Sequence, residues 1–303
     1  MNKTILIPES EKGKRIDVVL AELLGLPRAQ VQKSIKEELV LRGELALKAS
    51  YKVSGGETVT YSDVSMTTDD LVPYEMKLDI LYEDEYLLVI NKPAGLVVHP
   101  SFGHKDDTLV NALIARQGPL SDINGAFRPG IVHRLDKETS GLLVVCKNND
   151  VHTKVAKLLK DRKMKRHYLA LVVGALHEDA GVIKTYLARS KKNYQKMENT
   201  PSTGKLAITH FKVRARYEGY MLLDVELDTG RTHQIRAHME FLNTPVVGDR
   251  LYGTNNLKLY KEGQLLHAAR LVFPHPYTGQ IIDVSAPLPA YYENVIKRLE
   301  KDL

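Results

Sequence analysis

The start of the chain has the hydrophobic spacing of two short helices. Apolar residues recur at positions i, i+3, i+4, i+7 and i+8, which predicts one buried helix face. They are Ile16, Val19, Leu20, Leu23 and Leu24. Gly25 then supplies a stop, and Pro27 suits the first turn of a second helix. In that second helix Val31, Ile35 and Leu39 are expected to face inward.

A row of polar and basic side chains follows a different face of the second helix. Arg28, Gln32 and Lys36 lie four residues apart, and Lys33 lies beside them. Three short strand-like runs come next, over residues 39–41, 45–48 and 58–61. Two short helices with a basic row, followed by small strands, resemble an S4 RNA-binding domain. Residues 1–61 are therefore expected to form a small S4-like α/β domain; the alternative is a small α+β docking module.

A polar segment rich in Asp, Thr and Ser follows and is typical of a linker. The linker is expected over residues 62–77, and a second domain over residues 78–303. Strands are expected at 87–90, 141–145, 168–173, 210–216, 221–227 and 279–284, and helices at 108–116, 151–161, 233–242 and 290–301. Many strands with few interleaved helices favour a mixed, largely antiparallel central sheet over a doubly wound parallel one. The expected fold class is α+β.

The chain is basic, with a formal net charge of +6 and a pI of about 9.1, which favours a polyanionic partner. The excess of positive charge lies after residue 70, because the first part of the chain is nearly balanced. The densest basic run extends from Lys154 to Arg166. A solvated helix face and a surface for phosphate contacts are equally good interpretations of this run.

Composition also removes several classes of protein. Cys146 is the only cysteine, so an intramolecular disulfide and a Cys-rich zinc site are excluded, and its apolar neighbours indicate a buried thiol. The histidines lack zinc-like spacing, so no metal is expected. No apolar stretch reaches about 18 residues, and the first residues lack the pattern of a signal peptide. Neither a membrane helix nor secretion is expected, which leaves the cytoplasm as the default location.

A charged cluster, His133-Arg134-Leu135-Asp136-Lys137, stands directly before an apolar strand-like run. A carboxylate between cations is often no more than a surface turn held by ion pairs. Neighbouring Arg and Lys side chains, however, favour the ionised form of a carboxylate, which can attack an electrophilic carbon. Asp136 is therefore the candidate for chemistry.

The segment HRLDKETSGLLV, residues 133–144, resembles the catalytic signature of the RluA family of pseudouridine synthases. Further segments resemble the same family in the expected order. They are residues 92–100, 166–170, 227–238, 248–253 and 266–276. The resemblance extends from about residue 80 to the end and implies a pseudouridine synthase fold. With an S4-like domain in front, the layout is similar to the RluD subgroup, whose members modify large-subunit ribosomal RNA.

The resemblance implies roles for individual residues. Asp136 would be the catalytic nucleophile or base, and Arg236 would pair with it, although Arg231 could serve instead. Tyr168 would pack against the flipped base and assist proton removal at C5. Arg134 would enter the RNA helix when the target uridine leaves it. The wider set of expected binding residues comprises His133, Arg134, Arg231 and His233 for the substrate, and Arg28, Lys33, Lys36, Lys163 and Arg166 for RNA.

The implied reaction cuts uracil from C1′ of the ribose, turns the base and rejoins it through C5. It involves neither redox change nor hydrolysis, so no cofactor is expected. The carboxylate could attack the sugar or the base, or abstract a ribose proton, and the sequence leaves these routes open. Flipping the base costs a few kcal/mol, and stacking on an aromatic ring, worth about 1–3 kcal/mol, offsets it.

Other functions remain open at this point. A glycosidase or nucleosidase also uses carboxylates at an anomeric carbon, but it usually needs a flanking pair, and the motifs here offer one central Asp. A transfer-RNA pseudouridine synthase of the same family and a non-catalytic ribosome-assembly factor are further alternatives. Which uridines are modified and the oligomeric state cannot be deduced from the sequence.

Overall fold

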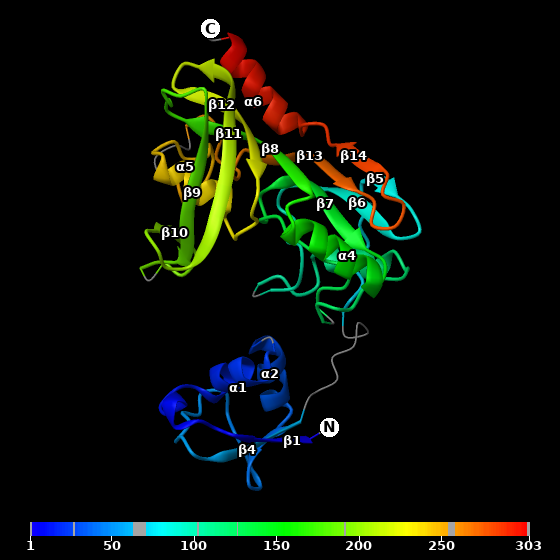
Figure 1. Cartoon of the computed structure of the whole chain (residues 1–303), viewed down its shortest axis with the longest axis vertical. Helices are drawn as coiled ribbons and strands as arrows, with labels where there is room; N and C mark the ends of the chain where they lie inside the picture. Colours follow the sequence, from blue (N-terminus) through cyan, green and yellow to red (C-terminus); the bar gives the residue numbers. More distant parts are fainter. Residues whose placement is uncertain are drawn as a thin grey trace. The chain divides into compact units, whose positions relative to one another are not determined.

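In the computed structural model, the described residues are 2–26, 28–62, 71–101, 103–125, 127–190, 192–253 and 258–301. The chain forms two compact units, Met1–Asp70 and Leu71–Leu303, which are described separately (Figure 1). Within the described ranges, no helix is both long enough and apolar enough to cross a membrane.

The first unit combines two helices with a small antiparallel sheet. The helices are α1 (Ile16–Leu24) and α2 (Arg28–Lys36), after a short 3-10 turn at Glu9–Glu11. The sheet has the order β1 (Asn2–Leu6), β4 (Thr58–Ser62), β2 (Val40–Arg42), β3 (Leu45–Ala46). Sequence patterning predicted both helices and three of these strands, but not β1.

The helix end predicted at Gly25 is present, because this residue has a left-handed φ of 65° and closes α1. The predicted apolar face is narrower than expected, since Leu23 is 43% exposed while Val19 and Leu20 are fully buried. The prediction for Pro27 lies outside the described residues.

The boundary between the units differs from the expected linker over 62–77. Ser62 belongs to β4, and residues 63–70 lie outside the described ranges. Leu71 is buried in the core of the second unit. Asn111 of that unit receives a hydrogen bond on its carbonyl from the Tyr74 amide, and its side-chain nitrogen donates to the Val72 carbonyl. The second unit therefore begins at Leu71, before the expected start at Leu78.

The second unit is built on a 10-stranded sheet (Figure 1). Its strands are β5 (Ile80–Glu83), β6 (Leu87–Lys92), β7 (Ser140–Cys146), β8 (Lys165–Val173), β9 (Ala180–Arg189), β10 (Met197–Thr200), β11 (Lys205–Tyr217), β12 (Tyr220–Leu227), β13 (Leu266–Pro274) and β14 (Ile281–Ser285). The order is β10-β9-β11-β12-β8-β13-β7-β6-β5, and β14 pairs with β13. Only the pairing of β13 with β7 is parallel among the described strands, so the expected mixed, largely antiparallel sheet is confirmed.

Four helices accompany this sheet, and all four lie where the sequence predicted them to within a few residues. They are α3 (Leu109–Ala115), α4 (Asn149–Lys160), α5 (Gln234–Phe241) and α6 (Ala290–Lys301). Each helix also has a buried side in the structure. The strands β5, β9, β10 and β13 were not predicted as strands.

Strands β6 and β7 are buried on both faces, and alternate side chains enter two different cores. Leu88 and Leu143 belong to the larger core, to which α3 contributes. Leu87 and Leu142 belong to a second core, which α4 covers (Figure 1). Cys146 is buried at the end of β7, and burial raises the pKa of its thiol to about 12. The segment that carries Asp136 leads directly into this firmly packed strand.

Candidate active site

Three segments that are far apart in the sequence line one cavity of about 580 Å³. The segment before β7 contributes His133, Arg134 and Asp136. Strand β8 contributes Arg166 and Tyr168. The loop after β12 and the start of α5 contribute Arg231, His233 and Arg236. The structure therefore brings together all the expected catalytic and substrate-binding residues, and Arg166 joins them.

The backbone around Asp136 is fixed by hydrogen bonds to neighbouring loops. The Thr139 amide donates to the Asp136 carbonyl at 3.1 Å, which closes a turn. The Lys137 carbonyl accepts from the Gly95 amide at 2.9 Å and from Lys92 Nζ at 3.0 Å. These contacts join the loop after β6 to the loop that presents Asp136.

Lys92 is a fully buried cation in this junction. Its ammonium donates to the Pro93, Leu96 and Lys137 carbonyls at 2.7, 2.9 and 3.0 Å. Burial lowers the pKa of Lys92 to about 7, although the charge of Asp136 opposes the shift. Within the described ranges, the side chain holds two loops together through three backbone oxygens.

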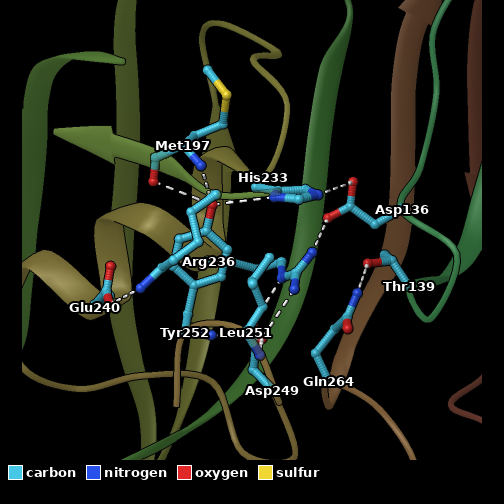
Figure 2. Close-up of polar contacts among 11 residues, drawn as sticks. Asp136, Thr139, Met197, His233, Arg236, Glu240, Asp249, Leu251, Tyr252 and Gln264 are labelled. Atoms are coloured by element: carbon cyan, nitrogen blue, oxygen red, sulfur yellow. Dashed lines mark hydrogen bonds and ion pairs between the residues drawn. The ribbon is translucent and has the colours of Figure 1, made fainter. Parts of the chain in front are cut away.

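Asp136 is held by a buried arginine that is itself held by a second carboxylate (Figure 2). Arg236 Nη1 donates to Asp136 Oδ2 at 3.0 Å. Its Nε and Nη2 donate to the two oxygens of Asp249 at 2.6 and 2.9 Å, in the bidentate geometry that fixes a guanidinium in its plane. The backbone amides of Leu251 and Tyr252 donate to Asp249 Oδ1 in turn.

The Arg236 guanidinium stays positively charged in this arrangement. Burial lowers the pKa of Arg236, but the hydrogen bonds to Asp249 and the charge of Asp136 outweigh it, and the net shift is upward. The Asp136 side chain keeps 16% of its surface exposed, on the cavity side. A carboxylate is thus aimed into a cavity by a permanent cation.

His233 stands beside the same carboxylate, with Nε2 3.9 Å from Asp136 Oδ1. It has a left-handed φ of 55° and immediately precedes α5. Its Nδ1 lies 3.1 Å from the Tyr252 hydroxyl, which accepts from the Met197 amide at 2.7 Å (Figure 2). Burial lowers the pKa of His233, so the ring is neutral near pH 7.

Tyr168 lies on β8 with its side chain 7% exposed, at the wall of the cavity. Burial raises the pKa of its phenol; the nearby Arg166 opposes this shift and the charge of Asp136 adds to it. The phenol is therefore neutral near pH 7. This arrangement favours a packing surface over a phenolate base.

The remaining expected substrate-binding residues differ in their surroundings. His133 Nε2 accepts from the Val144 amide at 3.0 Å, and burial lowers the pKa of this histidine to about 3. It is a neutral ring that supports β7 through the Val144 amide. Arg231 donates from Nε to the Leu206 carbonyl at 3.0 Å. Arg134 is exposed at the cavity.

In the first unit, two residues of the predicted polar and basic row, Arg28 and Gln32, form hydrogen bonds within the domain. Asp17 is fully buried and accepts from Arg15, Arg28 and Gln32. Burial alone would raise the pKa of Asp17, but these hydrogen bonds lower it to about 2. Arg28 is thus paired across the two helices, whereas Lys36 is exposed.

The basic run from Lys154 to Arg166 is not one surface. Lys154 pairs with Asp150 at 3.0 Å, and Lys165 pairs with Glu226 at 2.6 Å. Lys163 is exposed. Arg166 is only 6% exposed and lines the cavity, because it belongs to β8 and not to the preceding helix. The run therefore does not form one helix face, and its contact with phosphates stays a prediction.

Sequence reasoning did not single out Asp249, Lys92 or Tyr252. The first lies in the segment 248–253 that resembled the family, so the motif itself was the available signal. Among the described residues, no group of three His, Cys, Asp or Glu side chains is placed to hold a metal ion.

The cavity combines an oriented carboxylate with a buried aromatic ring in basic surroundings, an arrangement that suits acid–base or nucleophilic catalysis. A family model described as RNA pseudouridylate synthase matches residues 86–241. A relative from Bacillus subtilis (strain 168), "Uncharacterized RNA pseudouridine synthase YlyB", is 43% identical over 98% of each chain. The chain therefore belongs to the RNA pseudouridylate synthase family, and the resemblance predicted from its motifs is confirmed.

Further relatives are similar in sequence and in structure. "Ribosomal large subunit pseudouridine synthase D" of Xylella fastidiosa (strain Temecula1 / ATCC 700964) is 41% identical over 98% of this chain and 92% of the relative. The solved structure "Human RNA Pseudouridylate Synthase Domain Containing 1" superposes with a TM-score of 0.58 and 28% identity. It covers 70% of this chain and 84% of the human chain.

Proposed function

We propose that this chain converts specific uridines of large-subunit ribosomal RNA into pseudouridine, with Asp136 as the catalytic residue. One observation carries the proposal: Asp136 is held by Arg236 and Asp249 at the wall of a cavity that also contains Tyr168. The choice of RNA is supported by relatives named ribosomal large subunit pseudouridine synthase D, which are about 40% identical to this chain.

The reaction breaks the bond from N1 to C1′ and forms a bond from C5 to C1′, after which the proton on C5 leaves and N1 gains one. A carboxylate can assist by attacking the sugar or the base, or by removing a ribose proton. All three routes need an oriented Asp136 carboxylate. The pairing with Arg236 at 3.0 Å supplies this orientation.

Access to the base requires that the uridine leave the RNA stack. Tyr168 offers an aromatic ring against which the base packs, and Arg134, exposed at the cavity, has the reach to enter the vacated position. His233 and Arg231 complete the wall that surrounds the nucleotide. His133 contributes through its support of β7.

We assign residues 1–61 to an S4-like domain that adds RNA affinity, with Lys33 and Lys36 as its contacts and Arg28 as a support for the helix pair. Lys163 of the second unit is a further contact, because it is exposed in the segment that leads to β8. An enzyme that acts on ribosomal RNA works where that RNA is, and the cytoplasm is the proposed location.

The direct test is to map pseudouridines in ribosomal RNA from cells that lack the gene. We expect one or more large-subunit sites to lose their carbodiimide adducts, and a plasmid copy of the gene to restore them. An unchanged map of large-subunit RNA together with a lost site in transfer RNA would contradict the choice of substrate. Release of free uracil by the purified protein would contradict isomerisation.

A further inference from the structure

Arg166 is a buried cation without a counter-charge from any residue that the structure describes. It is 6% exposed, and no carboxylate of the described residues lies within ion-pair distance of it. Among the described residues, Arg166 makes one hydrogen bond, from Nη2 to the Leu227 carbonyl at 3.3 Å. Its buried Nε has no hydrogen-bond partner among the same residues. A buried guanidinium in this condition is costly, because it has lost water without gaining an anion.

The nearest acidic side chain is committed elsewhere. Asp228 lines the same cavity, but its carboxylate lies 3.2 Å from His210 Nε2 and 3.6 Å from Arg162 Nη1. Arg231 adds a further positive charge on the same wall and donates to a backbone carbonyl. The wall around Arg166 therefore has an excess of positive charge that the protein does not neutralise.

The backbone beside Arg166 is shaped to hold the guanidinium at the cavity. A Cβ atom added at Gly230 would lie 2.5 Å from Arg166 Nη1. The glycine thus lets the guanidinium lie directly against the loop between β12 and α5. Any larger residue there would displace the end of the arginine side chain.

The position of Arg166 relative to Tyr168 indicates which anion completes the site. The two residues are two apart on β8, so their side chains point to the same face of the sheet, about 6–7 Å apart along the strand. Tyr168 is proposed to pack against the flipped base. The only anions that RNA carries near a base are the phosphodiesters on either side of its nucleotide.

We propose that Arg166 binds one phosphodiester adjacent to the flipped uridine, and that Gly230 keeps its guanidinium in place for this contact. The proposal rests on the proposed function, because it places the target nucleotide beside Tyr168. It defines a phosphate subsite inside the cavity, separate from the surface cations of the basic run. Binding of the phosphate supplies the charge that Arg166 lacks.

The test measures binding of the full-length chain to a fragment of large-subunit RNA around the mapped uridine. Single methylphosphonate linkages, which carry no charge, replace the phosphodiester on the 5′ or the 3′ side. We expect one of the two to weaken binding by about tenfold to a hundredfold, since a hydrogen bond to a charged group is lost. Arg166→Gln should weaken binding of unmodified RNA by a similar factor.

The decisive comparison combines the two changes. If Arg166 contacts that phosphate, Arg166→Gln with the neutral linkage binds no more weakly than either change alone. If the two losses multiply for both linkages, Arg166 contacts something else, such as a uracil oxygen, and the proposal is overturned. Wild-type affinity of Arg166→Gln would overturn it as well.

Lys165→Gln is the matched control, because Lys165 is the preceding residue, is exposed and is paired with Glu226. It removes the same charge and should leave binding within twofold to threefold of the wild type. If Arg166→Gln fails to fold, wild-type protein with the two neutral linkages and the Gly230→Ala variant still give an answer. Unweakened binding in both experiments would overturn the proposal. Pseudouridine formation is read separately, so loss of the catalytic assignment would be distinguishable.

Discussion

Two arginines that line the same cavity are buried to the same degree, but carboxylates neutralise only one of them among the described residues. Arg236 is 7% exposed and contacts two carboxylates, with three charged hydrogen bonds. Arg166 is 6% exposed and contacts no carboxylate in the described part of the chain. A buried cation that is paired with carboxylates holds those carboxylates in place. A buried cation without a paired anion remains able to bind an anionic ligand. Arg236 positions Asp136, and Arg166 is the residue for which we propose a contact with RNA.

The largest effect on stability is expected for Arg236→Met. This change leaves the carboxylate of Asp249 buried without its cation, and removal of one partner of a buried pair costs about 3–5 kcal/mol. The unfolding free energy of the second unit, measured with denaturant, should fall by about that amount. A loss below about 1 kcal/mol would mean that the Asp249 pairing is not tight in solution, and the contrast between the two arginines would disappear.

An intermediate effect is expected from acid in the first unit, where the buried charge is a carboxylate. The folded pKa of Asp17 is about 2, below its ordinary value of 3.8. Its contribution is therefore complete above about pH 4 and is lost as pH falls through 2. The loss amounts to about 2 kcal/mol. The unfolding free energy, measured with denaturant between pH 6 and pH 2, should show this loss in the wild type and not in Asp17→Asn. An equal dependence of the unfolding free energy on pH in both proteins would contradict the pairing with Arg28.

The smallest effect on stability is expected for Arg166→Met, which replaces an uncompensated cation by an apolar side chain of similar length. The unfolding free energy without RNA should stay within about 1 kcal/mol of the wild type or rise, since the desolvation cost of the charge is removed. The same variant should still lose RNA affinity. A destabilisation as large as that of Arg236→Met would show that Arg166 is paired with an anionic side chain of the protein, which would contradict the contrast between the two arginines.

Much of the fold could be predicted because its elements have strong local patterns. Strands β6 and β7 are continuous apolar runs, and α4 and α6 have clear amphipathic spacing. Two of the unpredicted strands, β9 and β10, lack such patterns. In β10 all four residues, Met-Glu-Asn-Thr, are polar or only half-buried, and β9 is exposed at Val182 and Tyr186. These strands form because β9 pairs with β11 and β10 pairs with β9. Such pairings join residues that are apart in the sequence, so a short stretch of sequence does not reveal them.

The candidate site divides in the same way. Asp136 and Arg236 were found through motifs, but the Asp249 contact joins a residue of α5 to a residue of the following loop and depends on the folded backbone. Arg166 ends the basic run in the sequence and is expected to contact RNA, but the count of basic residues does not show that it lies beyond α4. Strand alternation in β8 turns this side chain inward, beside Tyr168. His133 was expected at the substrate, yet its ring accepts a backbone hydrogen bond from β7.

The most direct test of the central claim is the single-turnover rate of pseudouridine formation by purified Asp136→Asn on large-subunit RNA that contains the mapped uridine. This substitution keeps the size of the side chain and removes the charge that Arg236 orients. We expect no detectable product, with RNA affinity within a few-fold of the wild type. Pseudouridine formation at the wild-type rate would contradict the account.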